Sequence, residues 1–165
     1  MAQLEELLEA NRRYSQGFDR GGRAAAPARR LAVVTCMDAR IHPERLLGLD
    51  IGDAHVIRNA GGRVSDDVIR SLIISSRLLG TDTYLVIHHT DCGMQKHSNA
   101  EIRRMLREET SADASSMDFL VFTDLEQSVR DDVVKLRRSP YLRREVSVYG
   151  FVYDVQTGLL HAVGE

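Results

Sequence analysis

The chain has 165 residues, of which 43% are hydrophobic and 28% are charged, and we expect it to form a single domain over residues 1–165. Its net charge of −2 provides no broad basic field, which argues against nucleic acid or an anionic membrane as a partner. No apolar run approaches the roughly 20 residues that a membrane-spanning helix needs, and the acidic N-terminus does not resemble a signal peptide. We therefore expect a cytoplasmic protein whose two cysteines stay reduced.

Hydrophobic periodicity predicts helices and strands that alternate along the chain. An amphipathic helix is expected near residues 2–16, followed by a loose linker that ends at residue 28. Beyond it the pattern predicts strands at 31–35, 54–58, 83–88 and 145–153, and helices at 43–49, 66–79, 98–108 and 124–138. Strands that alternate with helices indicate an α/β fold with a mostly parallel β-sheet flanked by helices.

Both cysteines lie at the carboxyl ends of predicted strands, where open α/β sheets bind their ligands. Cys36 directly follows the first strand, and His89 and Cys92 follow the third. If these strands are neighbours, the three side chains can converge on one ion. Two thiolates and one imidazole suit Zn²⁺, and three protein ligands leave one position open, as in catalytic zinc sites. Taken alone, two thiols packed as small hydrophobic side chains are an equally good alternative.

A carboxylate and a guanidinium follow the first cysteine at short spacing. Asp38 and Arg40 lie two and four residues after Cys36, on the loop where that side chain arises. Such a pair can orient a water molecule beside a metal, whereas an ordinary surface ion pair would contribute at most about 1 kcal/mol. Their position next to a candidate ligand favours the catalytic interpretation.

The combined motifs resemble the signature of the β-class carbonic anhydrases. Cys36-x-Asp38-x-Arg40, followed some fifty residues later by His89-x-x-Cys92-Gly93, is similar to the family's pattern, and so is the turn at residues 59–62. The resemblance extends from about residue 11 to residue 160 and is closest to the short prokaryotic branch. It implies a homodimer or a dimer-based higher oligomer, in which residues 1–28 pack on a partner subunit.

The resemblance also implies an activity and a role for each site residue. The activity is that of carbonic anhydrase, a zinc lyase also called carbonate dehydratase, which reversibly hydrates CO2 to bicarbonate and a proton by attack of zinc-bound hydroxide. Cys36, His89 and Cys92 would bind Zn²⁺. Asp38 would accept a hydrogen bond from the zinc-bound oxygen, and Arg40 would hold Asp38 away from the metal. In some members the equivalent aspartate closes the site by binding the metal itself.

Two other functions remain open at this point. A hydrolase for CS2 or COS would use nearly the same zinc chemistry, because both molecules are linear and electrophilic like CO2. A non-catalytic zinc-binding domain would need the metal in order to fold. Two neighbouring residues also have two interpretations: His88 should point away from His89 in an alternating strand and pack in the core, and Asp91 is either a partner of the site or a turn residue.

Overall fold

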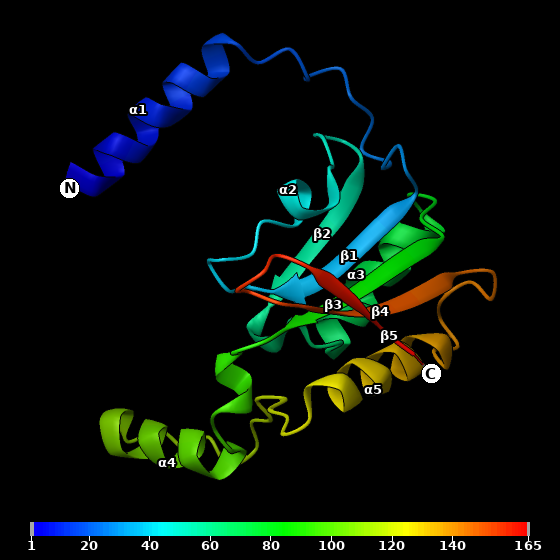
Figure 1. The fold of residues 1–165 in the computed structure, drawn as a ribbon. Helices are drawn as coiled ribbons and strands as arrows, with labels where there is room; N and C mark the ends of the chain where they lie inside the picture. Colours follow the sequence, from blue (N-terminus) through cyan, green and yellow to red (C-terminus); the bar gives the residue numbers. More distant parts are fainter. Residues whose placement is uncertain (1, 165) are drawn as a thin grey trace.

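A five-stranded β-sheet organises the chain in the order β2-β1-β3-β4-β5. The computed structural model describes residues 2–164, so Met1 and Glu165, the ends of the predicted domain, lie outside it. Strands β1 (Leu31–Cys36), β2 (Ala54–Asn59), β3 (Thr83–His89) and β4 (Ser147–Tyr153) run parallel to one another, and β5 (Leu160–Val163) is antiparallel to β4. The predicted α/β fold with a mostly parallel sheet is therefore confirmed (Figure 1).

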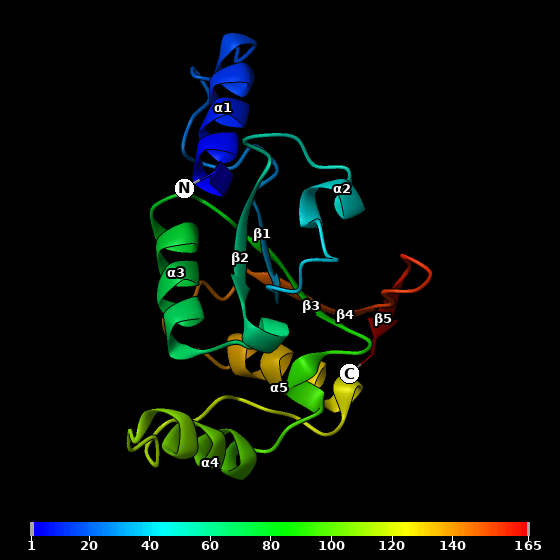
Figure 2. The ribbon, with the colours of Figure 1, turned by 90° about the vertical axis from the view of Figure 1, so that its left-hand side faces the viewer.

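Helices flank the sheet on both sides, as Figure 2 shows with the sheet seen near its edge. The longer helices α3 (Asp66–Arg77) and α5 (Leu125–Arg137) cover one face, and the short α2 (Pro43–Leu47) lies on the other side. Apolar side chains from α3 and α5 pack against β1, β3 and β4 to form the main core, for example Leu72, Val129 and Val86. Two one-turn helices, η1 (Ala60–Gly62) and η2 (Gly93–Gln95), follow β2 and β3.

Side-chain caps explain where three of the helices begin. Ser65 accepts a hydrogen bond from the Val68 amide and starts α3, and Asp124 accepts one from the Gln127 amide and starts α5. The helix α4 (Asn99–Thr110) begins at a capping box, in which the Ser98 and Glu101 side chains each accept from the other residue's backbone amide. These caps satisfy backbone donors that have no partner inside the helix, so the boundaries follow from local chemistry.

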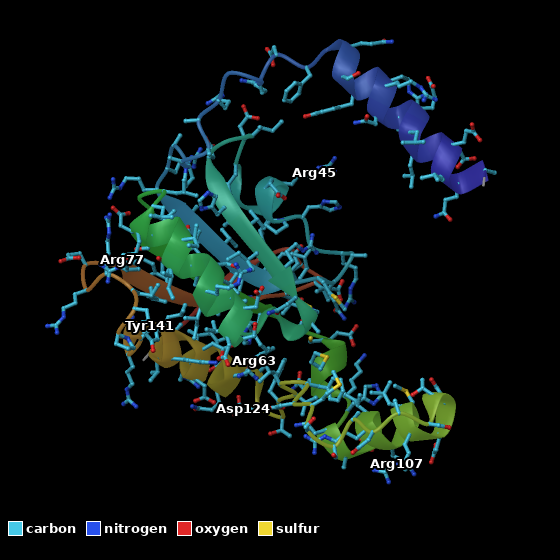
Figure 3. The ribbon with its side chains drawn as sticks, turned by 180° about the vertical axis from the view of Figure 1, so that it is seen from behind. Arg45, Arg63, Arg77, Arg107, Asp124 and Tyr141 are labelled. Atoms are coloured by element: carbon cyan, nitrogen blue, oxygen red, sulfur yellow. The ribbon has the colours of Figure 1, made fainter. Side chains whose placement is uncertain are left out.

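A charged network is buried between the sheet and α5. Asp132 of α5 is almost fully buried and accepts hydrogen bonds from Arg63 Nε at 2.8 Å, Arg63 Nη2 at 3.2 Å and the Val64 amide at 3.0 Å. Figure 3 shows Arg63 beside α5. His88 of β3 completes the network, with its Nε2 3.2 Å from Asp132 Oδ2 and its Nδ1 2.8 Å from Ser128 Oγ. The network ties α5 to the strand that ends at the candidate site.

Two helices stand clear of the sheet in Figures 1 and 2. The N-terminal α1 (Ala2–Gln16) buries none of its residues, and Leu4, Leu7 and Leu8 are at least half exposed. Helix α4 also contains no buried residue. Within residues 2–164 no helix has the length and apolarity to cross a bilayer.

One strand was not predicted. The pattern at residues 145–153 predicts the final strand, but the chain turns at Thr157–Gly158 and returns as β5, beside β4. Only four residues long, β5 has two exposed and two half-buried positions, so it lacks the apolar alternation that marks a strand. Its pairing with the preceding strand holds it in place, which is a tertiary effect.

Candidate metal centre

Three predicted ligands meet at the carboxyl edge of the sheet. Cys36 ends β1, His89 ends β3 and Cys92 follows one short turn later; their ligand atoms all lie within 4.8 Å of one another. They meet because β1 and β3 are hydrogen-bonded neighbours, and because β1 is followed by β2 on one side and β3 on the other. All three residues are buried and both cysteines are free. The site therefore lies at the point where strand order reverses.

The orientation of His89 fits a metal ligand. Its Nδ1 lies 2.8 Å from the Thr90 carbonyl oxygen, which can only accept, so Nδ1 carries the proton and donates it. The other ring nitrogen, Nε2, is buried without a hydrogen-bond partner. A buried acceptor nitrogen is costly when nothing contacts it, and a carbonyl on the opposite ring nitrogen is the usual support of a metal-binding histidine. The donor set therefore fits a metal ion.

The two thiols influence each other strongly. A hydrogen bond between the side chains lowers the pKa of Cys36, and that effect outweighs burial, which alone would raise it. The same bond raises the pKa of Cys92 above that of a free thiol, and burial adds to the rise. The pKa values of the two thiols are therefore shifted in opposite directions, and Cys36 is the more acidic of the pair. A thiolate already favoured at Cys36 is the form that binds a metal.

Asp38 and Arg40 form an ion pair beside these ligands. Arg40 Nε donates to Asp38 Oδ1 at 2.9 Å and Arg40 Nη2 donates to Asp38 Oδ2 at 2.7 Å, which is a bidentate arrangement. The Arg40 side chain holds the pKa of Asp38 well below its usual range. Asp38 Oδ2 also lies 3.9 Å from His89 Nε2. The carboxylate is thus ionised, oriented and adjacent to the candidate ligands.

The structure adds contacts that the sequence did not indicate. Arg58, near the end of β2, donates to the carbonyl oxygens of Cys36 at 3.1 Å and Asp38 at 2.8 Å, and so holds the loop between them. The register that pairs Thr35 with Arg58 puts this side chain within reach, and register is not readable from a single strand. Asp91, which had two interpretations, contacts Arg40, and Lys96 contacts Asp91.

The glycine turn lies directly against the backbone of the site. A Cβ at Gly62 would meet the Cys36 nitrogen at 2.8 Å and the Thr35 carbonyl carbon at 2.9 Å, and the residue has φ +68°. Gly61 is also left-handed, but its Cβ would meet only the side chains of Met94 and Arg63. The turn at residues 59–62 is therefore more than a tight turn, because Gly62 allows η1 to approach Cys36.

His88 points away from the candidate ligands, as the alternation predicted. Its ring is fully buried against α5, where it contacts Ser128 and Asp132 and stacks on Phe122 with ring centroids 5.7 Å apart. It is therefore a packed core residue, and His89 alone of this pair faces the cysteines.

A three-ligand cysteine and histidine cluster at the switch point of a parallel sheet defines a candidate metalloenzyme site. Comparison with known proteins identifies its family: the sequence profile of the carbonic anhydrases matches residues 31–160. β-Carbonic anhydrase 1 of Mycobacterium tuberculosis is 40% identical over 163 residues, which cover 99% of each chain. The chain belongs to the β-carbonic anhydrase family.

Solved structures and other relatives agree with this assignment. A crystal structure of carbonic anhydrase from Streptococcus mutans superposes with a TM-score of 0.91 at 47% identity, covering 99% of both chains. A carbon disulfide hydrolase of Saccharolobus solfataricus is 35% identical, over 78% of this chain and 74% of its own length. The two carbonic anhydrases named above thus match this chain at higher identity and coverage than that hydrolase does.

Proposed function

We propose that the protein catalyses the reversible hydration of CO2 to bicarbonate and a proton, with Zn²⁺ held by Cys36, His89 and Cys92. The observation that carries this proposal is the juxtaposition of the three ligand atoms with the preformed Asp38–Arg40 pair. Two thiols and an imidazole are a donor set typical of zinc, and a set of three leaves a coordination position for chemistry. A purely structural zinc site has no need of an oriented carboxylate beside it.

Asp38 and Arg40 would have separate roles in the reaction. When bound, zinc supplies a nucleophile by acidifying the water it carries, toward a pKa of about 7 in carbonic anhydrases with three histidine ligands. Asp38, ionised, can only accept hydrogen bonds, so it would accept one from the attacking water and thereby direct an oxygen lone pair at CO2. Arg40 occupies both Asp38 oxygens and so keeps the carboxylate from turning to the metal.

The apolar side chains packed around the candidate ligands suit an apolar substrate. Ile41 and Phe122 are buried against Cys36 and Cys92, and Met94, Leu125 and Tyr153 pack around them. CO2 has no net charge, whereas bicarbonate does, so an apolar wall favours entry of the former and release of the latter. CS2 is also apolar and linear, and a relative at 35% identity is named carbon disulfide hydrolase. CS2 or COS hydrolysis is therefore the second candidate function.

We further propose that the protein works as a homodimer or a dimer-based oligomer. Helix α1 has exposed leucines at positions 4, 7 and 8, spaced to form one apolar stripe, and no residue of α1 is buried in the single chain. Packing of residues 1–28 on a partner subunit would cover this stripe. The two free thiols at the site agree with a reducing compartment, which supports the cytoplasm as its location.

Stopped-flow CO2 hydration by the zinc-loaded protein tests the proposal. We expect zinc-dependent turnover in the wild type, loss of turnover with retained zinc in Asp38→Ala, and loss of zinc in Cys36→Ala. Glu44→Ala, on the exposed side of α2, is a control that should keep both. Absence of CO2 hydration at every pH with one zinc per chain would contradict the proposal, and measured CS2 or COS hydrolysis in the same samples would establish the second candidate.

A further inference from the structure

Four side chains of alternating charge run from the candidate metal centre to the solvent. Arg40 donates two hydrogen bonds to Asp38, and on its other side Arg40 Nη1 donates to Asp91 Oδ2 at 2.9 Å. The second oxygen of Asp91 accepts from Lys96 Nζ at 2.5 Å. The exposed fraction rises along the series, from 17% at Asp38 to 46% at Arg40, 51% at Asp91 and 58% at Lys96. Arg40 is therefore held between two carboxylates, one inside and one outside.

The turn that contains Asp91 is fixed to the sheet. Asp91 has φ +57°, a left-handed conformation that aspartate, asparagine and glycine tolerate best. The preceding residue, Thr90, donates its amide hydrogen to the Tyr153 carbonyl oxygen at 3.0 Å, and the following residue is Cys92. The backbone at Asp91 is thus held in place by the end of β4 and by the candidate ligand next to it, so the carboxylate extends toward Arg40 from a fixed point.

A second partner helps a half-exposed arginine to stay in one orientation. Arg40 is a long side chain with many rotamers, and an isolated exposed ion pair seldom outweighs the entropy of holding both side chains still. A second carboxylate on the opposite side of the guanidinium limits those rotamers, and Lys96 limits the rotamers of that carboxylate. Of the two interpretations of Asp91, the contacts favour a role in the site.

We propose that Asp91, held by Lys96, is a positioning residue that fixes the Arg40 guanidinium and thereby keeps Asp38 oriented beside the metal ligands. The proposal rests on the proposed function for its kinetic consequence, because Asp38 is placed in the catalytic step there. The structural part of the proposal, that the order of the Arg40 side chain depends on Asp91, can be tested without enzymatic turnover. If Asp91 were only a turn residue, its substitution would change neither the turnover nor the order of the Arg40 side chain.

Two substitutions separate the positioning role from the turn role. Asp91→Asn keeps the preference for the left-handed conformation and an oxygen acceptor but removes the charge, and Asp91→Gly removes the side chain without backbone strain. The matched control is Asp67→Asn on α3, whose exposed carboxylate pairs with Arg70 at 2.8 Å and has no ion pair with Arg40 or Lys96. Lys96→Met and Lys96→Arg test the outer contact, the second as a conservative rescue.

Steady-state CO2 hydration provides the first measurement. We expect kcat to fall about two- to fivefold in Asp91→Gly, with KM within about twofold of the wild type, because an exposed ion pair is worth up to about 1 kcal/mol. Zinc content should not change in any variant. Asp91→Asn and Lys96→Met should lie between Asp91→Gly and the wild type, while Lys96→Arg and Asp67→Asn should match the wild type.

Nuclear magnetic resonance of the Arg40 Nε–Hε group in the metal-free protein provides a second measurement that does not depend on activity. We expect slow hydrogen exchange in the wild type and in Asp67→Asn, and faster exchange in Asp91→Gly and Asp91→Asn, with Arg40→Lys identifying the signal. Exchange that depends on Asp91 in an inactive wild type would uphold the positioning role and contradict the proposed function. Unchanged exchange overturns the positioning role, whatever the kinetics. Asp91→Asn keeps the test open if Asp91→Gly does not fold.

Discussion

Gly62→Ala should damage the metal centre through the backbone alone, without altering a ligand side chain. The new Cβ would lie 2.8 Å from the Cys36 nitrogen and 2.9 Å from the Thr35 carbonyl carbon, and neither atom can rotate away. Left-handed backbone costs an alanine about 1–2 kcal/mol, and relieving a steric overlap in a packed region costs about 1–3 kcal/mol more. We therefore expect the free energy of unfolding to fall by about 2–5 kcal/mol, the sum of the two terms.

Gly61→Ala is the matched comparison, because Gly61 has φ +80° and its Cβ would meet only movable side-chain atoms, at 3.2 Å. The free energy of unfolding of Gly61→Ala should fall only by the cost of the left-handed backbone for alanine, about 1–2 kcal/mol. Urea unfolding of the zinc-free proteins, followed by circular dichroism, measures the difference. A competition titration with a chelating dye should show about tenfold weaker zinc binding in Gly62→Ala, since the displaced backbone belongs to Cys36. Equal stability and equal zinc affinity in the two variants would refute the reasoning.

Three further predictions concern the buried network, the metal loop and the N-terminal helix. Burial alone would raise the pKa of Asp132, but contacts from His88 and Arg63 lower it. The Asp132 carboxylate therefore contributes stability above the ordinary carboxyl pKa, and this contribution is lost as pH falls through the lower folded-state pKa. Asp132→Asn should therefore lower the free energy of unfolding by about 3–5 kcal/mol near neutral pH. It should also make the stability measured by thermal unfolding fall less steeply as the pH decreases. An unchanged pH dependence would contradict this. Arg58→Met removes the donors to the carbonyl oxygens of Cys36 and Asp38 and should weaken zinc binding about tenfold or more in the dye titration, with little change in the far-ultraviolet spectrum. Deletion of residues 2–16 should leave the thermal unfolding of the sheet domain intact and lower the sedimentation mass to that of one chain; a dimer of the shortened chain would show that α1 is dispensable for assembly.

The local sequence pattern predicted most of the fold, but it did not predict the contacts between residues that are distant in the sequence. Strands β1 and β3 could be predicted because they are continuous apolar runs. The candidate ligands Cys36, His89 and Cys92 could be predicted because they lie at or just after the ends of these runs. The fold and family expectations were confirmed, while the roles of the individual site residues stay proposals. Strand β5 was missed because its pairing, and not its composition, makes it a strand.

The surroundings of the site were predicted less well than its ligands. Arg58 is the last residue of the predicted strand at 54–58, and its contact with the Cys36 loop depends on the parallel register of β1 and β2. Lys96 belongs to none of the sequence motifs, and only the fold brings it to Asp91. Long, flexible side chains reach partners in several directions, so their type and spacing do not determine which contact forms.

The ladder of hydrogen bonds between β1 and β3 also bears on how the protein acquires its metal. Two of the candidate ligands end strands that are paired along their length, and the third lies one turn beyond, so the chain brings the donor atoms together by folding. Zinc-finger peptides behave differently, because there the ion supplies the free energy that folds the chain. A nascent chain of this protein could therefore complete its sheet first and take the ion from a cellular metal pool afterwards. The identity of the bound ion would then reflect metal availability and exchange in the cell, with the folded scaffold selecting among the ions it meets.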